Sequence, residues 1–212
     1  MEINFIITCF DRENYWPYLK EILNSYKLIK PHITFCYSGT KEIPFDYRTY
    51  NRGKQFGDAD LIRGGHFTLT ENKVKNWIKI SVDSWLCDEQ KIINIFEQME
   101  KNDACYAGSF WDDKYHFSTD IMFVRDTKFD FWEKFKDQVY SWLAHDCMEG
   151  LAAKLAKESG QYYLIPERSV IPNRYRHACE ALGWIMQHDL QKNIDFLERY
   201  KNEHFNSNTN AN

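Results

Sequence analysis

The chain has 212 residues, of which 43% are hydrophobic and 27% are charged, and its formal net charge is -4. This is enough apolar material for one domain with a packed core, and the mildly acidic balance argues against binding nucleic acid through a broad basic surface. No apolar run approaches the ~20 residues of a membrane span, and the amino terminus lacks the basic region of a signal peptide, so we expect a cytoplasmic domain.

The first elements alternate between strand and helix. A β-branched apolar run over residues 3–8 predicts a buried strand. Apolar residues at helical spacing over 16–26 predict a helix, with Pro17 in its first turn. A second strand is predicted over residues 32–37. This order is typical of a right-handed βαβ unit and a parallel sheet.

The rest of the chain continues in the same manner, after a region over residues 39–57 that we expect to be a loop. Further strands are predicted over residues 77–82, 104–110, 118–124 and 162–165, and helices over 59–69, 91–99, 131–143, 148–156 and 178–200. The last residues have too little apolar content to pack. We therefore expect one domain over residues 1–203 and a flexible tail or linker over 204–212.

Ligands in an open α/β sheet bind outside the carboxyl ends of the strands, so the residues that follow each strand are the first candidates. Thr8, Phe10, Asp11 and Arg12 end the first strand and offer hydrogen-bonding groups, a flat aromatic face and a guanidinium. A nucleotide base and its phosphates can use all of these. The alternative is a strand end at which Asp11 caps the following helix.

Asp83 directly follows the strand over residues 77–82 and precedes Ser84 and Trp85. A carboxylate in this place is a hard oxygen ligand that can hold Mg²⁺ or Mn²⁺ against a diphosphate. The alternative is an aspartate that caps a helix or stabilises a turn, which is common at strand ends.

The segment over residues 51–63 mixes glycines with cationic and acidic side chains. Arg52, Lys54 and Arg63 can neutralise phosphates, and Asp60 can accept a hydrogen bond from a ribose or a base. The alternative is a solvated loop before a helix that Asp58 or Asp60 caps. Asp58 and Asp60 also spell a literal DxD, but no apolar strand leads into it, so we do not expect the metal motif here.

Asp146 and Glu149 lie three residues apart at the start of a predicted helix. Side chains at this spacing share one helix face, where they can orient an acceptor hydroxyl and take its proton. The alternative is a capped helix with an acidic first turn.

The order of these segments resembles that of GT-A glycosyltransferases, which are nucleotide-sugar-dependent enzymes. Among them, we find it most similar to the amino-terminal glycosyltransferase domain of a multidomain chlorella virus protein. The segments that carry the resemblance are IITCFDR (6–12), NRGKQFGDADLIR (51–63), KISVDSW (79–85), FSTDIMFVR (117–125) and HDCMEGLAAKLAKESGQYYLIPE (145–167).

This resemblance implies a single Rossmann-like GT-A domain with a central mixed, mainly parallel sheet flanked by helices. It also implies transfer of a hexose or deoxyhexose, of the glucose or rhamnose class, from a UDP-sugar to a glycan hydroxyl. A divalent cation would bind through Asp83, and Glu149 or Asp146 would be the general base of an inverting enzyme. Further domains could follow this one, and a viral protein of this kind would act in the host-cell cytoplasm.

The sequence departs from the family pattern at the DxD motif, which would here be Asp83-Ser84-Trp85. Because Trp85 stands at the second acidic position, either a distant residue such as His177 completes the metal shell or metal binding is weak. Trp85 can instead stack on the donor sugar.

Two other classes of function remain open. A nucleotidyltransferase commonly carries a glycine-rich loop after its first strand, whereas residues 9–13 contain no glycine. A non-catalytic carbohydrate-binding module would suit the 7 Trp and 13 Tyr residues, but such a module would bind neither UDP nor a metal ion.

Overall fold

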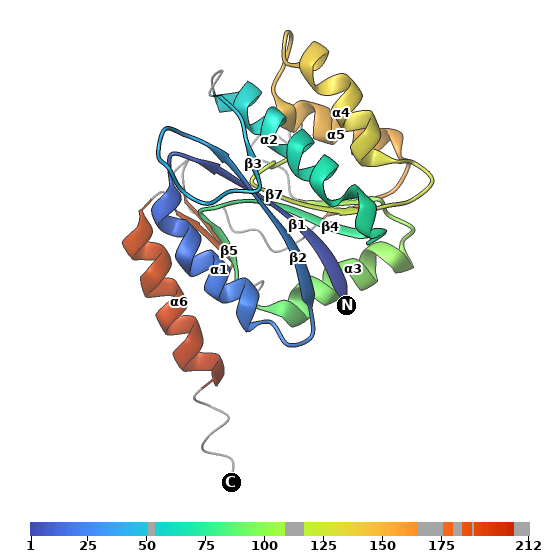
Figure 1. The fold of residues 1–212 in the computed structure, drawn as a ribbon. Helices are drawn as coiled ribbons and strands as arrows, with labels where there is room; N and C mark the ends of the chain where they lie inside the picture. Colours follow the sequence, from blue (N-terminus) through green and yellow to red (C-terminus); the bar gives the residue numbers. More distant parts are fainter. Residues whose placement is uncertain (51–53, 109–116, 165–175, 180–183, 188, 206–212) are drawn as a thin grey trace.

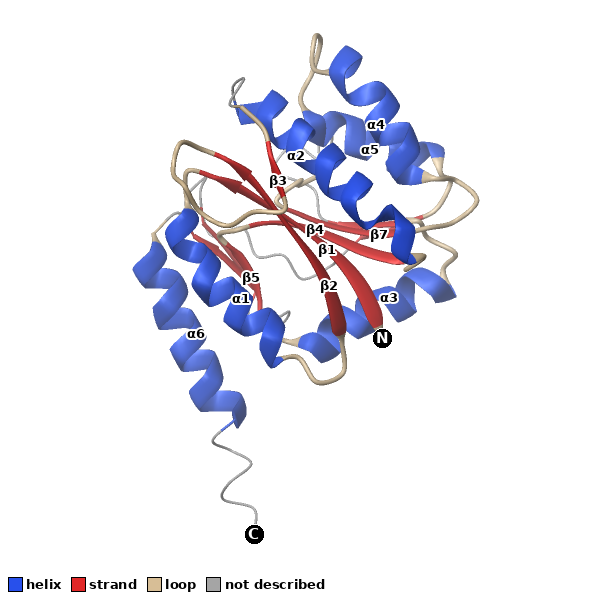
Figure 2. Cartoon of the chain, viewed as in Figure 1, coloured by secondary structure: helices blue, strands red, loops and turns tan. Residues whose placement is uncertain are grey.

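The computed structural model describes residues 1–50, 54–108, 117–164, 176–179, 184–187 and 189–205. In this part of the chain a central β-sheet carries α-helices on both faces (Figure 1), and the layers are clearest when helices and strands are coloured separately (Figure 2). The domain therefore belongs to the α/β class, as the sequence predicts.

The central sheet contains seven of the described strands, in the order β3-β2-β1-β4-β7-β6-β8. Pairing is parallel except at β7, which runs antiparallel to both β4 and β6. The sheet is thus mixed and mainly parallel, which confirms the prediction. The strands are Glu2–Phe10 (β1), Lys30–Ser38 (β2), Tyr47–Arg48 (β3), Asn76–Ser81 (β4), Tyr106–Gly108 (β6), Ile121–Arg125 (β7) and Tyr162–Leu164 (β8).

Helices cover the sheet in two groups, with α1, α3 and α6 packed into one hydrophobic cluster and α2, α4 and α5 into the other. Figure 1 shows α2, α4 and α5 together on one side of the strands. The described helices are Trp16–Ser25 (α1), Lys54–Leu69 (α2), Glu89–Lys101 (α3), Phe131–Trp142 (α4), Met148–Glu158 (α5) and Leu190–Phe205 (α6), with 3-10 turns at Glu13–Tyr15 (η1) and Thr70–Asn72 (η2).

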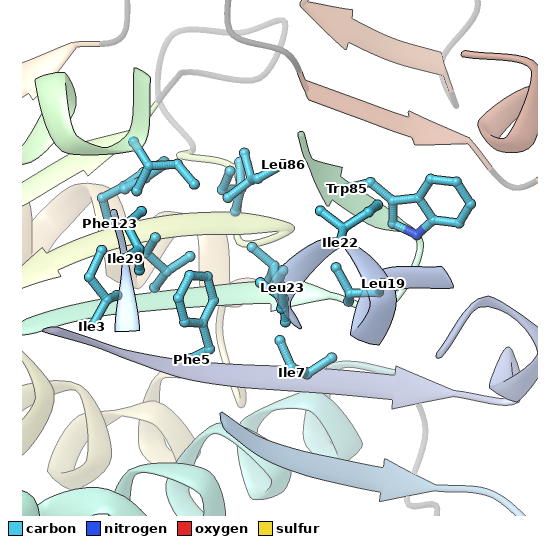
Figure 3. Close-up of a cluster of buried hydrophobic side chains, with 14 of the residues drawn as sticks. Ile3, Phe5, Ile7, Leu19, Ile22, Leu23, Ile29, Trp85, Leu86 and Phe123 are labelled. Carbon is cyan, nitrogen blue, oxygen red and sulfur yellow. The ribbon is translucent and has the colours of Figure 1, made fainter. Parts of the chain in front are cut away.

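The alternation of side chains along β1 explains why it needs cover on both faces. Ile3, Phe5 and Ile7 point into the cluster with α1 (Figure 3), whereas Ile6 belongs to the cluster on the opposite face. Successive side chains of a strand point to opposite faces of the sheet, so a strand that is apolar throughout is stable only between two helical layers. The residues of α1 that meet this face are Leu19, Ile22 and Leu23.

A small second sheet corrects the prediction of one helix over residues 178–200. Its strands are β5 (Ser84–Leu86), β9 (Arg176–Cys179) and β10 (Trp184–Gln187), with β10 in the middle, and α6 begins only at Leu190. The prediction was wrong because a short apolar run does not distinguish a strand from a buried helical segment. The segment over residues 184–187 is a strand because it pairs antiparallel with β5, which lies far away in the sequence.

The region expected to be a loop over residues 39–57 is also more ordered than predicted, because it contains β3 and the first turn of α2. Gly57 lies inside α2, and a Cβ atom there would come within 2.8 Å of Cε2 of Phe10. The absence of a side chain therefore lets α2 approach the end of β1. Of the tail expected over residues 204–212, positions 206–212 lie outside the described residues.

Candidate functional site

One edge of the central sheet brings together several of the residues that the sequence indicates as site candidates. The carboxyl ends of β1, β2, β4 and β6 meet the amino end of β7 there, because β7 alone among these strands runs the other way. A backbone hydrogen bond from Val82 to the carbonyl of Thr8 (2.9 Å) ties the ends of β1 and β4 together. This is the edge at which α/β proteins bind their ligands.

The residues at the end of β1 differ in exposure. Thr8 is buried, Phe10 is half-buried against Gly57 of α2, and Asp11 is exposed. Asp11 has a φ angle of 52°, in the left-handed region that aspartate tolerates better than most residues. The chain therefore turns sharply at Asp11, directly before Arg12.

Arg12 and Asp83 form an ion pair that joins the segments after β1 and β4. The Asp83 side chain is only 3% exposed, whereas that of Arg12 is 36% exposed. Asn193 of α6, which is fully buried, donates a hydrogen bond to the carbonyl of Asp83 (2.9 Å). The Asp83 segment is thus fixed from two sides, with a cationic side chain between its carboxylate and solvent.

Ser84 and Trp85 follow Asp83 but turn into the protein interior. Both are fully buried, and Trp85 packs against Tyr18 and Tyr15, with ring centroids 5.6 and 6.3 Å away. Its indole N–H donates to the carbonyl of Val82 (3.2 Å). In this structure neither side chain offers a surface to a ligand at the sheet edge, and their part in binding stays a prediction.

Asp60 and Arg63 take part in contacts that join α2 to its neighbours. The carboxylate of Asp60 accepts hydrogen bonds from the hydroxyl groups of Tyr140 in α4 and Thr49 after β3. Arg63 is exposed and lies over the ring of Tyr140, 4.7 Å from its centroid. A nucleotide that used Asp60 would compete with these contacts. Arg52, which we also considered for phosphates, lies outside the described residues, as does the side chain of Lys54.

Glu149 reaches the sheet edge, whereas Asp146 lies before the first turn of α5. Glu149 lies in the first turn of α5, where its carboxylate accepts hydrogen bonds from the hydroxyl of Thr119 (3.3 Å) and the amide of Gln55 (3.5 Å). Its backbone carbonyl accepts from the amide of Phe117 (3.1 Å). Asp146 is exposed before α5 and accepts from the amide of Cys147 (2.8 Å).

A buried lysine at this edge was missed by the sequence analysis. Lys79 lies in the middle of β4 with no exposed surface, and its ammonium group contacts the carboxylate of Asp58 (3.0 Å) and the carbonyl of Thr119 (2.6 Å). A lysine inside the apolar strand WIKIS was the signal that could have revealed it, because a buried charge needs a partner.

Asp120 was missed as well, since it precedes a strand instead of following one. It lies directly before β7, and its carbonyl accepts a hydrogen bond from the amide of Ser81 at the end of β4 (2.9 Å). Burial raises the pKa of its carboxyl group; Lys79 opposes this shift, while nearby Asp83, Asp58 and Glu149 add to it. The edge therefore concentrates carboxylates around two cationic groups.

The donor set at Asp83 suits a hard divalent cation, for which carboxylate oxygens are the usual protein ligands. No three His, Cys, Asp or Glu side chains converge as a metal centre in the part of the chain that the structure describes. Mg²⁺ commonly binds through one or two carboxylates and completes its shell with substrate phosphates. The residues therefore fit a cation that arrives with a diphosphate. His177 lies on β9, and its side chain lies outside the described residues.

Solved structures of other proteins share the fold of this chain, whereas comparisons of the sequence find no match. No protein-family model matches the chain, and no curated protein matches its sequence. A solved glycosyltransferase involved in the glycosylation of the major capsid of PBCV-1, a chlorella virus, shares the fold with a TM-score of 0.50 at 12% identity, over 77% of this chain and 82% of that one. No described helix combines the length and apolar character needed to cross a bilayer.

Two further solved structures are similar at TM-scores of 0.48. The glycosyltransferase GlyE of Streptococcus pneumoniae TIGR4 is 10% identical, over 78% of this chain and 45% of that one. The nucleoside-diphosphate-sugar pyrophosphorylase of Vibrio cholerae RC9 is 10% identical, over 92% of this chain and 99% of that one. At the level of the fold, the similarity to the PBCV-1 protein confirms the resemblance to a GT-A glycosyltransferase that the sequence motifs indicate.

Proposed function

We propose that this chain is a glycosyltransferase that moves a hexose or deoxyhexose from a UDP-sugar to a glycan hydroxyl with the help of Mn²⁺ or Mg²⁺. The observation that carries this proposal is the Arg12–Asp83 pair at the point where β1 and β4 end, with Glu149 at the same edge. A cationic group, a hard carboxylate and a candidate base thereby meet where this fold class binds nucleotides.

Arg12 is the candidate partner for the diphosphate. Its guanidinium is partly exposed, is permanently charged, and can pair with two phosphate oxygens at once. Thr8, Phe10 and Asp11 surround the same strand end and provide hydrogen-bonding groups and an aromatic face for the base. A cation bound through Asp83 would offset the negative charge that develops on the departing UDP. Arg12 adds to the same stabilisation from the side of β1.

Glu149 is the better of the two candidate bases on geometric grounds. Thr119 and Gln55 hold its carboxylate beside the amino end of β7, so it is oriented at the edge at which the donor would bind. A general base must lie within hydrogen-bond reach of the hydroxyl that it deprotonates. In an inverting reaction Glu149 would take the proton of the acceptor hydroxyl as the sugar is transferred. In a retaining reaction it would instead hold the sugar or the acceptor.

The test is to incubate the protein with a panel of UDP-, GDP- and CMP-sugars, with Mn²⁺, Mg²⁺ or EDTA, and to measure release of the nucleotide with and without glycan acceptors. We expect metal-dependent release of UDP from a UDP-hexose or UDP-deoxyhexose. A protein that binds glycans but neither hydrolyses nor transfers any nucleotide sugar would be a carbohydrate-binding module, and the proposal would be wrong.

A further inference from the structure

We infer that Asp120 is a second cation-binding carboxylate of this site and acts beside Asp83. This inference rests on the proposed function, and it identifies the acidic side chain that is missing where Trp85 replaces the second aspartate of the DxD pattern. It assigns that role to a residue 37 positions further along the chain, at the start of a strand that runs in the opposite direction.

The position of Asp120 follows from the pairing of β4 with β7. Ile80 is opposite Ile121 in this antiparallel pair, so Asp120 comes next to Ser81, where β4 ends. The amide of Ser81 donates to the carbonyl of Asp120 (2.9 Å), and the Ser81 hydroxyl lies 3.5 Å from its carboxylate. Asp83 is two residues beyond Ser81, and it is close enough to raise the pKa of Asp120. Both carboxylates therefore belong to the same end of β4.

Comparison with Asp58 separates a structural role from a binding role. Both carboxylates lie near the buried ammonium group of Lys79, but only Asp58 forms an ion pair with it, at 3.0 Å. Among the residues that the structure describes, no Lys, Arg or His nitrogen lies within 4.0 Å of the Asp120 carboxylate. Nor does a described backbone amide donate to that carboxylate, so Asp120 caps neither a turn nor a strand.

A carboxylate without a cationic partner is costly in this environment. Asp120 is half-buried, its carboxylate accepts a hydrogen bond only from the Ser81 hydroxyl among the described residues, and Asp83, Asp58 and Glu149 surround it with negative charge. Like charges nearby disfavour the ionised form, and such arrangements are characteristic of sites where function needs them. A divalent cation between Asp120 and Asp83 would relieve the repulsion between the carboxylates. It would also give the carboxylate of Asp120 the cationic partner that it lacks among the described residues.

The first arm of the test measures the thermal stability of the ligand-free protein. We expect Asp120→Asn to raise Tm by about 2–4 °C, because it removes an uncompensated charge and keeps the shape of the side chain. Asp58→Asn is the matched control, because it also neutralises a carboxylate near Lys79. It should lower Tm, since Asp58 is the direct partner of the buried lysine.

The second arm measures binding of Mn²⁺ to the protein in the presence of saturating UDP, by the loss of the electron paramagnetic resonance signal of free Mn²⁺. We expect wild-type protein to bind Mn²⁺, and Asp120→Asn to bind it at least about tenfold more weakly, since even residues that only support metal ligands cost about 10–100-fold in affinity. Asp58→Asn should retain most of the wild-type affinity.

The outcomes separate this inference from the proposed function. If wild-type protein binds Mn²⁺ with UDP and Asp120→Asn binds it equally well, the inference is wrong while the proposed function stands. A drop in the Tm of Asp120→Asn like that of Asp58→Asn would likewise overturn the inference, because it would make Asp120 a structural residue. If the wild-type protein itself binds no UDP and no Mn²⁺, both the proposed function and the inference are overturned.

Discussion

Two ion pairs flank the central strand β4 and differ in which partner is hidden. In the Lys79–Asp58 pair the lysine side chain of β4 is 0% exposed and the aspartate side chain of α2 is 19% exposed. In the Arg12–Asp83 pair the aspartate is 3% exposed, but the arginine is 36% exposed. The cationic member is therefore fully buried in the first pair and open to solvent in the second.

This difference indicates different roles. The ammonium group of a fully buried lysine cannot exchange its carboxylate partner for a ligand without disturbing the packing around it, so removal of this pair is expected to act on stability. A pair with an accessible guanidinium can exchange water or a neighbouring group for a phosphate, so its removal is expected to act on binding and catalysis. β4 thus carries a fully buried charge in its middle, whereas the solvent-accessible pair lies just after its end, where the proposed function places the diphosphate.

The largest expected effect tests the role that we propose for the Arg12–Asp83 pair. Asp83→Asn should lower the rate of UDP-sugar turnover by about 10²–10³-fold or more, because it removes the carboxylate on which electrostatic stabilisation of the leaving group depends. Circular dichroism should show that the fold is kept, since asparagine preserves the shape of the side chain. Turnover equal to that of wild type would remove Asp83 from the site.

The next prediction concerns the candidate base. Glu149→Gln should lower kcat by about 10²–10⁴-fold, as expected for loss of general base catalysis, and should leave the Kd for UDP unchanged. Steady-state kinetics and a UDP titration measure the two quantities. Asp146→Asn is the matched variant, and a larger loss of kcat in it would transfer the role of the base to Asp146. Equal loss of binding and turnover in Glu149→Gln would indicate a structural residue.

The Lys79–Asp58 pair gives a prediction for stability. Lys79→Met should lower the free energy of unfolding by about 3 kcal/mol, because it leaves the carboxylate of Asp58 half-buried without its cation. Urea denaturation measures this change. The double variant Lys79→Met/Asp58→Leu should recover part of the loss, since the unpaired charge is then gone. A loss well below about 1 kcal/mol in the single variant would mean that this pair is no more important than a surface pair.

The smallest expected effect is a pH dependence on the face that also holds Lys79. His66 is buried against Trp77 and Trp132, and burial lowers its pKa from 6.5 to about 4. The unfolded chain therefore binds a proton between these pH values that the folded chain does not bind, and stability falls as the pH falls from about 6.5 towards 4. This contribution amounts to about 1 kcal/mol between pH 7 and 5.5.

The variant His66→Gln isolates this effect from the titration of the carboxylates. Its free energy of unfolding should decline less steeply than that of wild type over the same pH range in urea denaturation. Parallel pH profiles for the two proteins would show that His66 is protonated as easily in the folded as in the unfolded state.

Most of the central sheet was predictable because its pattern is local. The apolar run that becomes β1 and the helical spacing of Leu19, Ile22 and Leu23 predict their elements directly, and the βαβ order then indicates a parallel sheet. The small sheet was not predictable in the same way. Its middle strand β10 pairs with β5, about 100 residues earlier in the chain. A local sequence pattern does not predict a pairing partner at that distance.

The position of a candidate residue at the sheet edge was predictable where the residue follows a parallel strand. Asp83 was singled out because it comes after an apolar run, and Arg12 because it follows β1; their roles in binding stay predictions. Asp120 was missed because its strand is antiparallel, which brings the amino end of β7 to the edge where the other strands have their carboxyl ends. The sequence predicts that a strand is present but not which way it runs in the sheet. Residues that precede a strand are therefore not recognised as candidates for the binding edge.

The proposed function is tested most directly by an isothermal titration of UDP into the wild-type protein, with and without Mn²⁺. We predict binding at one site per chain that tightens when Mn²⁺ is present, and we predict that Asp83→Asn loses this dependence on Mn²⁺. Absence of UDP binding under both conditions, or binding that is the same in wild type and Asp83→Asn, would contradict it.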